Sequence, residues 1–257
     1  TEAPAAGRKV ALYATCFVNY NNPDIGDAAR AVLAHNGVEA EVVYPECCGM
    51  PQLEGGELKD VAGRARRVAA ALAIWIEDGY DIVAMTPSCA LMLKFEWPLI
   101  VPDNAQVKRL ADATFDLSEY IVDIAKKEGL ADGMTALPGG VAVHLACHAR
   151  AQNMGAKAAE LLRYVPDAKV TIVERCSGHG GSWGIKTKNF PVALKVGAPA
   201  AQRAADADAA FVVSECPLAG KHIVQGMEKI DGATAKLAAA RAFHPVELVA
   251  RAYGLVK

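Results

Sequence analysis

The stretch Pro45-Glu46-Cys47-Cys48-Gly49-Met50-Pro51 decides how the rest of the chain is interpreted. Its adjacent cysteines are poor disulfide partners for each other, because neighbouring Cα atoms lie about 3.8 Å apart, closer than the usual ~4.4–6.8 Å. The flanking prolines stiffen the backbone, whereas Gly49 lets it turn. The segment is therefore suited to present two thiols at a fixed angle, although buried cysteines can also serve simply as small hydrophobic side chains.

Composition indicates a globular protein of a reducing compartment. The 257 residues leave room for one large domain or two ordinary ones, 53% are hydrophobic, and the formal net charge is −2. We therefore expect no nucleic-acid partner. The most apolar run, Val68–Ile76, is shorter than the roughly 20 residues of a membrane-spanning helix, and we expect no transmembrane segment or signal peptide. Seven cysteines in such a chain favour metal-binding or redox thiols and a cytoplasmic location.

Strand-like runs alternate with helical patterns, and the whole pattern occurs twice. The six strands predicted before a cysteine cover residues 9–14, 38–44, 80–85, 141–145, 169–173 and 209–213. The pattern predicts an α/β fold of two repeated Rossmann-like halves, with mainly parallel sheets and with cysteines at the carboxyl ends of the strands. We place the halves at residues 1–130 and 138–257, joined by a linker that ends in Pro138-Gly139-Gly140.

The spacing of the cysteines repeats as well. Cys16 and Cys47 are 31 positions apart, and Cys147 and Cys176 are 29 apart. The next step, to the last cysteine of each half, is 41 positions from Cys48 and 40 from Cys176. Ligands of open parallel sheets bind at the carboxyl ends of the strands, so the cysteines of each half are expected to converge. The candidate ligands of a metal ion or cluster are Cys16, Cys47, Cys48, Cys89, Cys147, Cys176 and Cys216.

The duplicated motif resembles the cysteine-rich CCG domain, which occurs in the B subunit of heterodisulfide reductase and in the iron–sulfur C subunit of anaerobic glycerol-3-phosphate dehydrogenase. Related glycolate and lactate oxidase subunits carry it too. The segments Ala14–Pro23 and Cys47–Pro51, and His244-Pro245 near the end, look most like the glycerol-3-phosphate dehydrogenase branch. The resemblance covers essentially the whole chain.

The resemblance implies an iron–sulfur electron-transfer subunit or domain of an oxidoreductase, of the dehydrogenase or heterodisulfide reductase type. It implies one or two 4Fe–4S clusters on the cysteines above, the first of the cubane or the non-cubane kind. The implied partners are a flavoprotein dehydrogenase, a ferredoxin-like subunit or domain, and a quinone or disulfide acceptor. Such a protein is expected in the cytoplasm, or at the inner face of the membrane through its partners.

Departures from the family motif make the two halves unequal. Met92 and Ala219 stand where the family has a final cysteine, and Ser177 replaces one cysteine of the second pair. The first half keeps four thiols, enough for an iron–sulfur cluster, and the second keeps three. His179, in the glycine-rich turn after Cys176, is our first choice as a further metal ligand, with His148 and His222 as alternatives.

Two other functions stay open on the sequence. Zinc held by four cysteines, or by three cysteines and a histidine at the second site, would make the chain a structural or interaction module, although paired Cys-x-x-Cys motifs are absent. A thiol enzyme with Cys48 or Cys176 as nucleophile would need an exposed thiol of low pKa. Lys186 and Lys188 could attract an anion, and Arg64–Arg67 could touch a partner or an anionic membrane.

Overall fold

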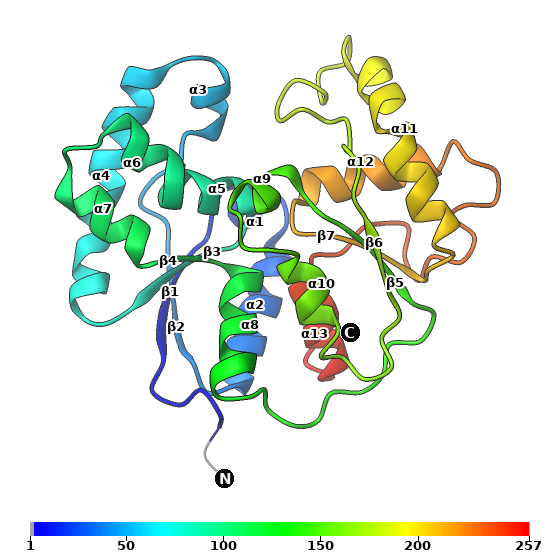
Figure 1. The fold of residues 1–257 in the computed structure, drawn as a ribbon, viewed down its shortest axis with the longest axis horizontal. Helices are drawn as coiled ribbons and strands as arrows, with labels where there is room; N and C mark the ends of the chain where they lie inside the picture. Colours follow the sequence, from blue (N-terminus) through cyan, green and yellow to red (C-terminus); the bar gives the residue numbers. More distant parts are fainter. Residues whose placement is uncertain (1–2, 257) are drawn as a thin grey trace. The chain divides into compact units, whose positions relative to one another are not determined.

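The computed structural model describes residues 3–256 as two compact α/β units (Figure 1). The first unit extends to Asp132 and also includes Ala151–Asn153, whereas the second takes Gly133–Arg150 and the residues from Met154 onward. Each unit has one sheet in which all strands run parallel. The predicted α/β class with two repeated halves is confirmed, while the limits 1–130 and 138–257 stay a prediction.

The first unit contains a four-stranded sheet in the order β2-β1-β3-β4. Its strands are β1 (Lys9–Tyr13), β2 (Glu39–Val43), β3 (Asp81–Ala84) and β4 (Thr114–Asp116). The central strand β1 pairs on both sides, so that Leu12 lies opposite Val42 and Val83. The sequence predicts the first three strands within a few residues but misses β4, which is too short to show an alternating pattern.

Helices connect these strands, as parallel crossovers require. They are α1 (Cys16–Tyr20), α2 (Pro23–His35), α3 (Met50–Glu54), α4 (Leu58–Glu77), α5 (Pro87–Leu91), the π-helix η1 (Met92–Glu96), α6 (Trp97–Ile100), α7 (Ala105–Asp112) and α8 (Leu117–Lys127). Helix α4 buries Val61, Ala65, Val68 and Leu72, one face at helical spacing, and packs against α7. Helices α2 and α8 lie on the other side of the sheet (Figure 1).

The π-helical turn η1 follows the short helix that carries Cys89. Sequence patterns predict an ordinary helix over residues 90–96, but this turn holds one extra residue and changes the direction of the side chains after it. Trp97, the first residue of α6, follows this turn and is fully buried, and its indole Nε1 donates to the carbonyl of Cys48 at 3.2 Å. Through the Trp97 side chain, the segment that carries Cys89 is therefore hydrogen-bonded to the Cys47-Cys48 loop.

A buried polar network closes the carboxyl end of β4. Asp116 caps α8, and Glu119 completes the capping box. The Gln152 amide donates to Asp116 Oδ2 at 3.2 Å and to the carbonyl of Pro87 at 3.3 Å. Lys94 Nζ donates to Glu119 at 2.6 Å and to the Gln152 side chain at 3.2 Å. These bonds explain why residues around Gln152 belong to the first unit.

The second unit has a three-stranded sheet in the order β6-β5-β7. Its elements are β5 (Val141–His144), α9 (Cys147–Ala151), α10 (Lys157–Leu162), β6 (Val170–Val173), α11 (Phe190–Asp206), β7 (Phe211–Ser214), α12 (Pro217–Met227) and α13 (Pro245–Ala252). Small side chains at Ala200, Ala201 and Ala204 let α11 approach Ile223 and Met227 of α12 closely. At the start of α13, buried His244 forms a capping box with Glu247, so this histidine is structural.

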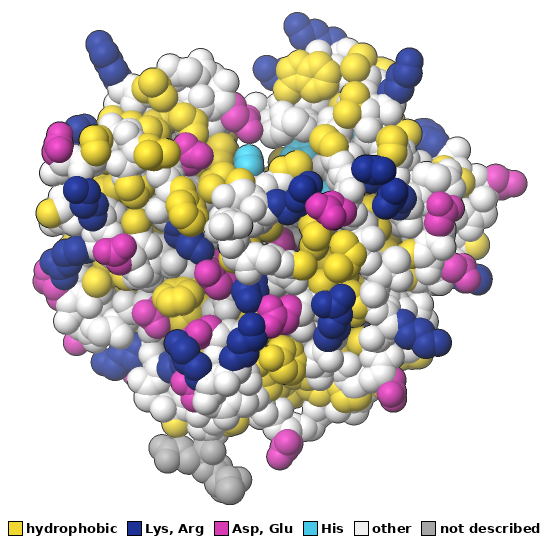
Figure 2. Space-filling view, viewed as in Figure 1, with side chains coloured by type: hydrophobic (Ala, Val, Ile, Leu, Met, Phe, Trp, Pro, Cys, Tyr) yellow, Lys and Arg dark blue, Asp and Glu magenta, His cyan; other side chains and the backbone are white. Residues whose placement is uncertain are grey.

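The face of the molecule shown in Figure 2 carries no dominant charge. Side chains of both signs are distributed over the face shown in Figure 2, as a net charge of −2 leads one to expect. None of the helices in the described part of the chain combines the length and the apolar character needed to cross a bilayer.

Asp116→Asn is expected to flatten the pH dependence of the unfolding free energy between about pH 4 and about pH 6. Burial raises the pKa of Asp116 from 3.8 to about 6. In this window the folded chain therefore binds more protons than the unfolded chain, and it loses stability as the pH rises. Asparagine keeps an oxygen for the helix cap but has no such proton. Urea unfolding across this range measures the slope, with the exposed Asp103→Asn as control; an unchanged slope would contradict this assignment.

Candidate metal centre

The four cysteines of the first unit follow the carboxyl ends of three adjacent strands. Cys16 begins α1 just after β1, Cys47 and Cys48 lie in the loop between β2 and α3, and Cys89 lies in α5 after β3. Because β2, β1 and β3 are neighbours in the sheet, their ends meet at one edge. The structure thus brings together all the predicted ligands of the first half.

The thiols stand in two contacting pairs of different exposure. Cys47 Sγ lies 3.9 Å from Cys16 Sγ, and both residues are half-buried. Cys89 Sγ lies 3.2 Å from Cys48 Sγ, and both residues are buried. All remain free cysteines. A group bound here would have one side in the protein core and one side near solvent.

Hydrogen bonding makes the thiols electrostatically unequal. The pKa of Cys47 is lowered, first by its hydrogen bonds with the thiols of Cys16 and Cys48, and further by the Gly49 N–H and the charge of Arg64. The same hydrogen bonds, together with burial, raise the pKa of Cys16 and Cys48. The first thiolate therefore forms easily at Cys47, and removal of further protons requires a cation to neutralise the added charge.

Two aromatic side chains fix the backbone on either side of the cysteine pair. The hydroxyl of fully buried Tyr13 donates to the carbonyl of Glu46, and the Trp97 indole donates to the carbonyl of Cys48. Gly49 follows with a φ of +82°, which favours glycine, and starts α3. Sequence reasoning missed Tyr13 and Trp97, since in sequence they cannot be distinguished from ordinary core aromatics.

Arg64 and Arg67 of α4 hold Glu46, the residue before the pair. Arg67 donates to both Glu46 carboxylate oxygens at 2.9 Å, and Arg64 Nη1 lies 3.0 Å from Oε1. These arginines lower the pKa of Glu46, Arg67 most strongly. Arg64 also lies beside Gly49, where an added Cβ would come within 3.0 Å of its Cδ, and places positive charge near Cys47. Both arginines thus pair with Glu46, Arg64 from a largely buried position and Arg67 with 59% of its side chain still exposed.

The second unit repeats this arrangement with three cysteines. Cys147 begins α9 after β5, Cys176 lies in the loop after β6, and Cys216 caps α12 after β7. Burial and the nearby Cys176 raise the pKa of Cys147, and burial raises the pKa of Cys216 to about 11. Cys147 and Cys176 are exposed, so this site is wetter than the first.

Close contacts that only glycine allows hold the Cys176 loop against α11. Gly178 has a φ of +83°, and a Cβ there would lie 2.3 Å from the Ala193 carbonyl oxygen. A Cβ on Gly197 would lie 2.2 Å from the Ser177 carbonyl oxygen. The Gly178 N–H in turn donates to Cys176 Sγ at 3.4 Å. The close backbone approach indicated by the glycine-rich sequence is thus an approach to α11, and it positions Cys176.

Among the candidate histidines, His179 has a ring held in place by a neighbouring side chain. Its Nδ1 lies 2.8 Å from the Ser177 hydroxyl, which fixes the ring and turns Nε2 away from that bond. Burial, reinforced by nearby His222, His144 and His148, lowers the pKa of His179 to about 4. The imidazole is therefore neutral near pH 7, the form that binds metals.

Two other histidines differ in the use of their ring nitrogens. His144 contacts the Ser214 hydroxyl at 3.1 Å and the Arg175 carbonyl at 3.0 Å, so both nitrogens are engaged. His222 is buried against Phe190, and its Nε2 has no hydrogen-bond partner among the described residues. His222 therefore stays an alternative to His179, whereas His144 is structural.

The donor chemistry of both sites fits a thiolate-bound metal group. Among residues 3–256, no three His, Cys, Asp or Glu side chains are already grouped around the position of a single ion. The thiols of the first unit instead contact each other, as protonated thiols do. Thiolates are the soft ligands that zinc and iron–sulfur clusters select, so the same side chains suit either group once deprotonated.

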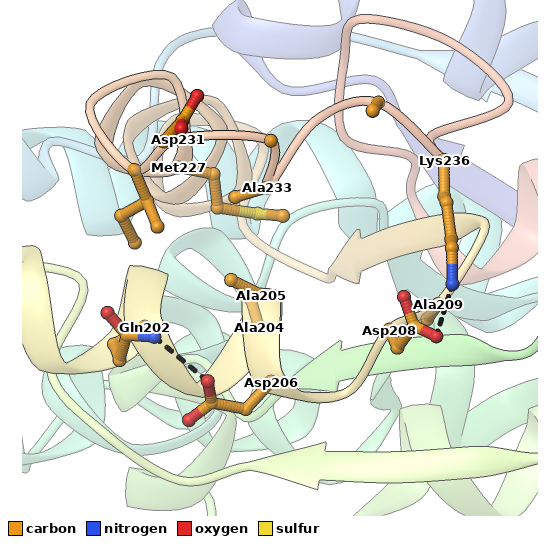
Figure 3. A pocket seen from close by; sticks show the side chains of 13 residues that line it. Gln202, Ala204, Ala205, Asp206, Asp208, Ala209, Met227, Asp231, Ala233 and Lys236 are labelled. Carbon is orange, nitrogen blue, oxygen red and sulfur yellow. Dashed lines mark hydrogen bonds and ion pairs between the residues drawn. The ribbon is translucent and has the colours of Figure 1, made fainter.

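A pocket of about 360 Å³ lies elsewhere in the second unit, before the amino-terminal end of β7 (Figure 3). Met227 is among the residues that line it, Gln202 donates to Asp206 at 2.8 Å, and Lys236 pairs with Asp208 at 2.5 Å. It contains none of the cysteines or histidines predicted from the sequence. The cysteine sites are therefore not part of this pocket.

Arg64→Gln is expected to raise the pKa of the Cys47 thiol in the metal-free chain, because a nearby positive charge is lost. The pH at which alkylation of Cys47 by iodoacetamide reaches half of its maximal rate should therefore move upward, since only the thiolate reacts. Mass spectrometry of the Cys47 peptide across a pH series gives the rate. Arg66→Gln, on the same helix but outside the Glu46 contacts, is the control. Identical profiles for wild type and Arg64→Gln would refute the role of this charge.

Gly178→Ala is expected to destabilise the chain by about 2–4 kcal/mol, because its Cβ would overlap the Ala193 carbonyl. Gly155→Ala is the matched control: its φ of +81° is similar, but open space surrounds it. This control should lose only about 1 kcal/mol through backbone strain. Chemical denaturation compares the two; equal losses would show that the Gly178 contact is unimportant.

Comparison with known proteins agrees with this geometry. Residues 10–94 and 141–223 match the family described as the cysteine-rich domain, CCG. The chain is 29% identical over 215 residues to the C subunit of anaerobic glycerol-3-phosphate dehydrogenase from Escherichia coli K12, covering 81% of this chain and 52% of that protein. It thus spans about half the length of this relative.

Lactate utilization protein A is a second kind of relative. The chain is 30% identical to the protein of Bacillus velezensis and 32% identical to that of Bacillus licheniformis, each over 189 residues. Each match covers 69% of this chain and 75% of the relative. With two family matches that coincide with its two cysteine-bearing units, the chain belongs to the CCG cysteine-rich domain family.

Proposed function

We propose that this chain is an iron–sulfur electron-transfer subunit, or a domain of one, in a dehydrogenase-type oxidoreductase. The observation that carries the proposal is the convergence of four thiols, in two pairs, at one sheet edge of the first unit. A cluster bound there would accept and release single electrons. Its ligands, in a 4Fe–4S cluster of cubane or non-cubane kind, are Cys16, Cys47, Cys48 and Cys89.

The surrounding residues prepare the first site for such a group. Tyr13 and Trp97 hold the carbonyls of Glu46 and Cys48, so that both cysteines of the pair keep one orientation. Buried Cys48 and Cys89 keep water from one side of the site. Arg64 offsets part of the negative charge that thiolate ligands bring. These features support binding of a thiolate-rich cluster over a role of the cysteines as packing residues.

The second site supports either a second cluster or zinc. We propose Cys147, Cys176 and Cys216 as its ligands and His179 as the fourth. Zinc is favoured by one observation, the Ser177–His179 bond, because metal-bound histidines usually engage their other ring nitrogen. With zinc at both sites, the chain would be a structural or interaction module instead.

Partners are part of the proposal. A relative is named as a subunit of anaerobic glycerol-3-phosphate dehydrogenase, which supports a dehydrogenase subunit as the partner of this chain. We propose that this partner is a flavoprotein that donates the electrons, and that the chain acts in the cytoplasm or at the inner face of the membrane. The electron acceptor that we propose is a quinone or a disulfide. A ferredoxin-like subunit or domain can carry electrons between the flavoprotein and this chain. A thiol enzyme acting through Cys48 is disfavoured, since this thiol is buried and its pKa is raised.

Iron, zinc and acid-labile sulfide content after anaerobic purification tests the proposal, together with EPR of the reduced and oxidised chain. About eight irons per chain would indicate two 4Fe–4S clusters, and about four would indicate that only the first site is loaded. One or two zinc ions without sulfide would overturn electron transfer and leave the structural module.

Two substitutions assign the ligands. Cys48→Ser should remove the iron of the first site, because its thiolate is lost from the buried pair. Ser177→Cys should add iron to the second site by restoring the cysteine pair, whereas Ser182→Cys, in the same loop, should leave metal content unchanged. Metal contents that neither Cys48→Ser nor Ser177→Cys alters would contradict these ligand assignments.

A further inference from the structure

An apolar surface is exposed on the second unit beside its cysteine site. It is formed by the loop before α11 and by the outward face of that helix, and we name it the α11 surface. Its large hydrophobic side chains, with their exposed fractions, are Trp183 at 45%, Ile185 at 59%, Val192 at 53% and Val196 at 51%. A helix that faces water normally carries polar residues there. The outward face of α11 instead continues from Val196 to exposed Pro199.

Hydrogen bonds join loop and helix into one surface. The Asn189 side chain donates to the carbonyl of Trp183 at 2.9 Å. The Phe190 N–H, at the first residue of α11, donates to the carbonyl of Lys186 at 3.0 Å. Trp183 and Ile185 are therefore held near the amino-terminal end of the helix, the end at which Val192 lies. The inner face of α11, with Ala193 and Gly197, is occupied by the loop and by α12 and is not part of this surface.

The charge of this surface is entirely positive. No aspartate or glutamate occurs between Ser177 and Ala205, although the chain as a whole has a net charge of −2. Exposed Lys186, Lys188 and Lys195 flank the hydrophobic side chains, and none of the ion pairs of the described residues involves them. Hydrophobic and basic side chains gather over α11 and its loop at the upper right of Figure 2.

We propose that the α11 surface docks directly onto an anionic lipid bilayer. Tryptophan prefers the membrane–water interface, and each lysine near anionic lipid adds to the attraction. Lysine can also lay its aliphatic stem along apolar surface while its ammonium group reaches the headgroups. A protein partner is the weaker match, because protein interfaces are depleted in lysine. This inference goes beyond electron transfer and holds whichever metal occupies the second site.

Sedimentation with lipid vesicles tests the proposal on the purified, metal-loaded chain, whose metal content is measured separately. The wild type should bind vesicles of equal parts phosphatidylglycerol and phosphatidylcholine, and bind phosphatidylcholine vesicles at least about tenfold more weakly. Added salt should release it. Binding should also shift the emission of Trp183 to shorter wavelength, as its indole leaves water.

Substitutions distinguish docking by the α11 surface from attraction of the vesicles by the overall charge of the chain. Lys186→Gln, Lys188→Gln and Lys195→Gln together should weaken vesicle binding about 100-fold, from roughly fivefold per lysine. The matched control removes three lysines elsewhere, by Lys59→Gln, Lys108→Gln and Lys229→Gln, and should change binding little. Trp183→Ser with Val196→Ser should weaken binding while charge is unchanged and abolish the emission shift.

Two outcomes would overturn the proposal. Wild-type protein that stays in solution with anionic vesicles would exclude a bilayer and leave the surface to a protein partner. Equal weakening by the two lysine triples would show attraction by overall charge rather than docking by this face. Either result is independent of the iron and sulfide content, so a failure here is distinguishable from a failure of the electron-transfer proposal.

Discussion

Parallel pairing of three adjacent strands is the constraint on which both candidate sites depend. In the first unit Tyr13 lies opposite both Val43 and Ala84, and in the second unit His144 lies opposite both Val173 and Ser214. Each of these strands ends at one common edge, and a cysteine follows each end within a few residues. Pairing that ran antiparallel would place alternate strand ends at opposite edges and separate the thiols by the length of a strand.

The two sites differ in their access to water and in the number of thiols that they hold. In the first unit, Cys48 and Cys89 extend the hydrophobic core, where a charge is costly without a compensating cation. In the second unit the Ser177 hydroxyl bonds His179 and orients its imidazole. The residue that stands in place of a cysteine of the motif thus fixes the orientation of the histidine that we propose as the fourth ligand.

The sequence was sufficient for the fold class, the doubling and the grouping of the cysteines, because those depend on strand period and cysteine spacing. It was insufficient for what holds the Cys47-Cys48 loop. Tyr13 and Trp97 act through backbone carbonyls, which no side-chain pattern reports, and Trp97 reaches its partner only through the π-turn. From sequence, Arg64 and Arg67 are expected to form a solvated helix face. Their partner Glu46 lies 18 and 21 positions earlier in the chain and comes close to them only after folding.

Both sites share one electrostatic problem and solve it with different residues. Converging thiolates repel one another, and each additional negative charge, from deprotonation or reduction, raises the cost of the next. In the first unit the positive charge of Arg64, which Asp60 and Glu46 hold near Cys47, offsets part of this repulsion. In the second unit Arg175 precedes Cys176 directly, and the chain after this cysteine runs into a stretch with lysines and without acids. At Cys147 the charge of Arg150 offsets part of the rise in pKa that burial and the nearby Cys176 cause, so in this unit too an arginine favours the thiolate form.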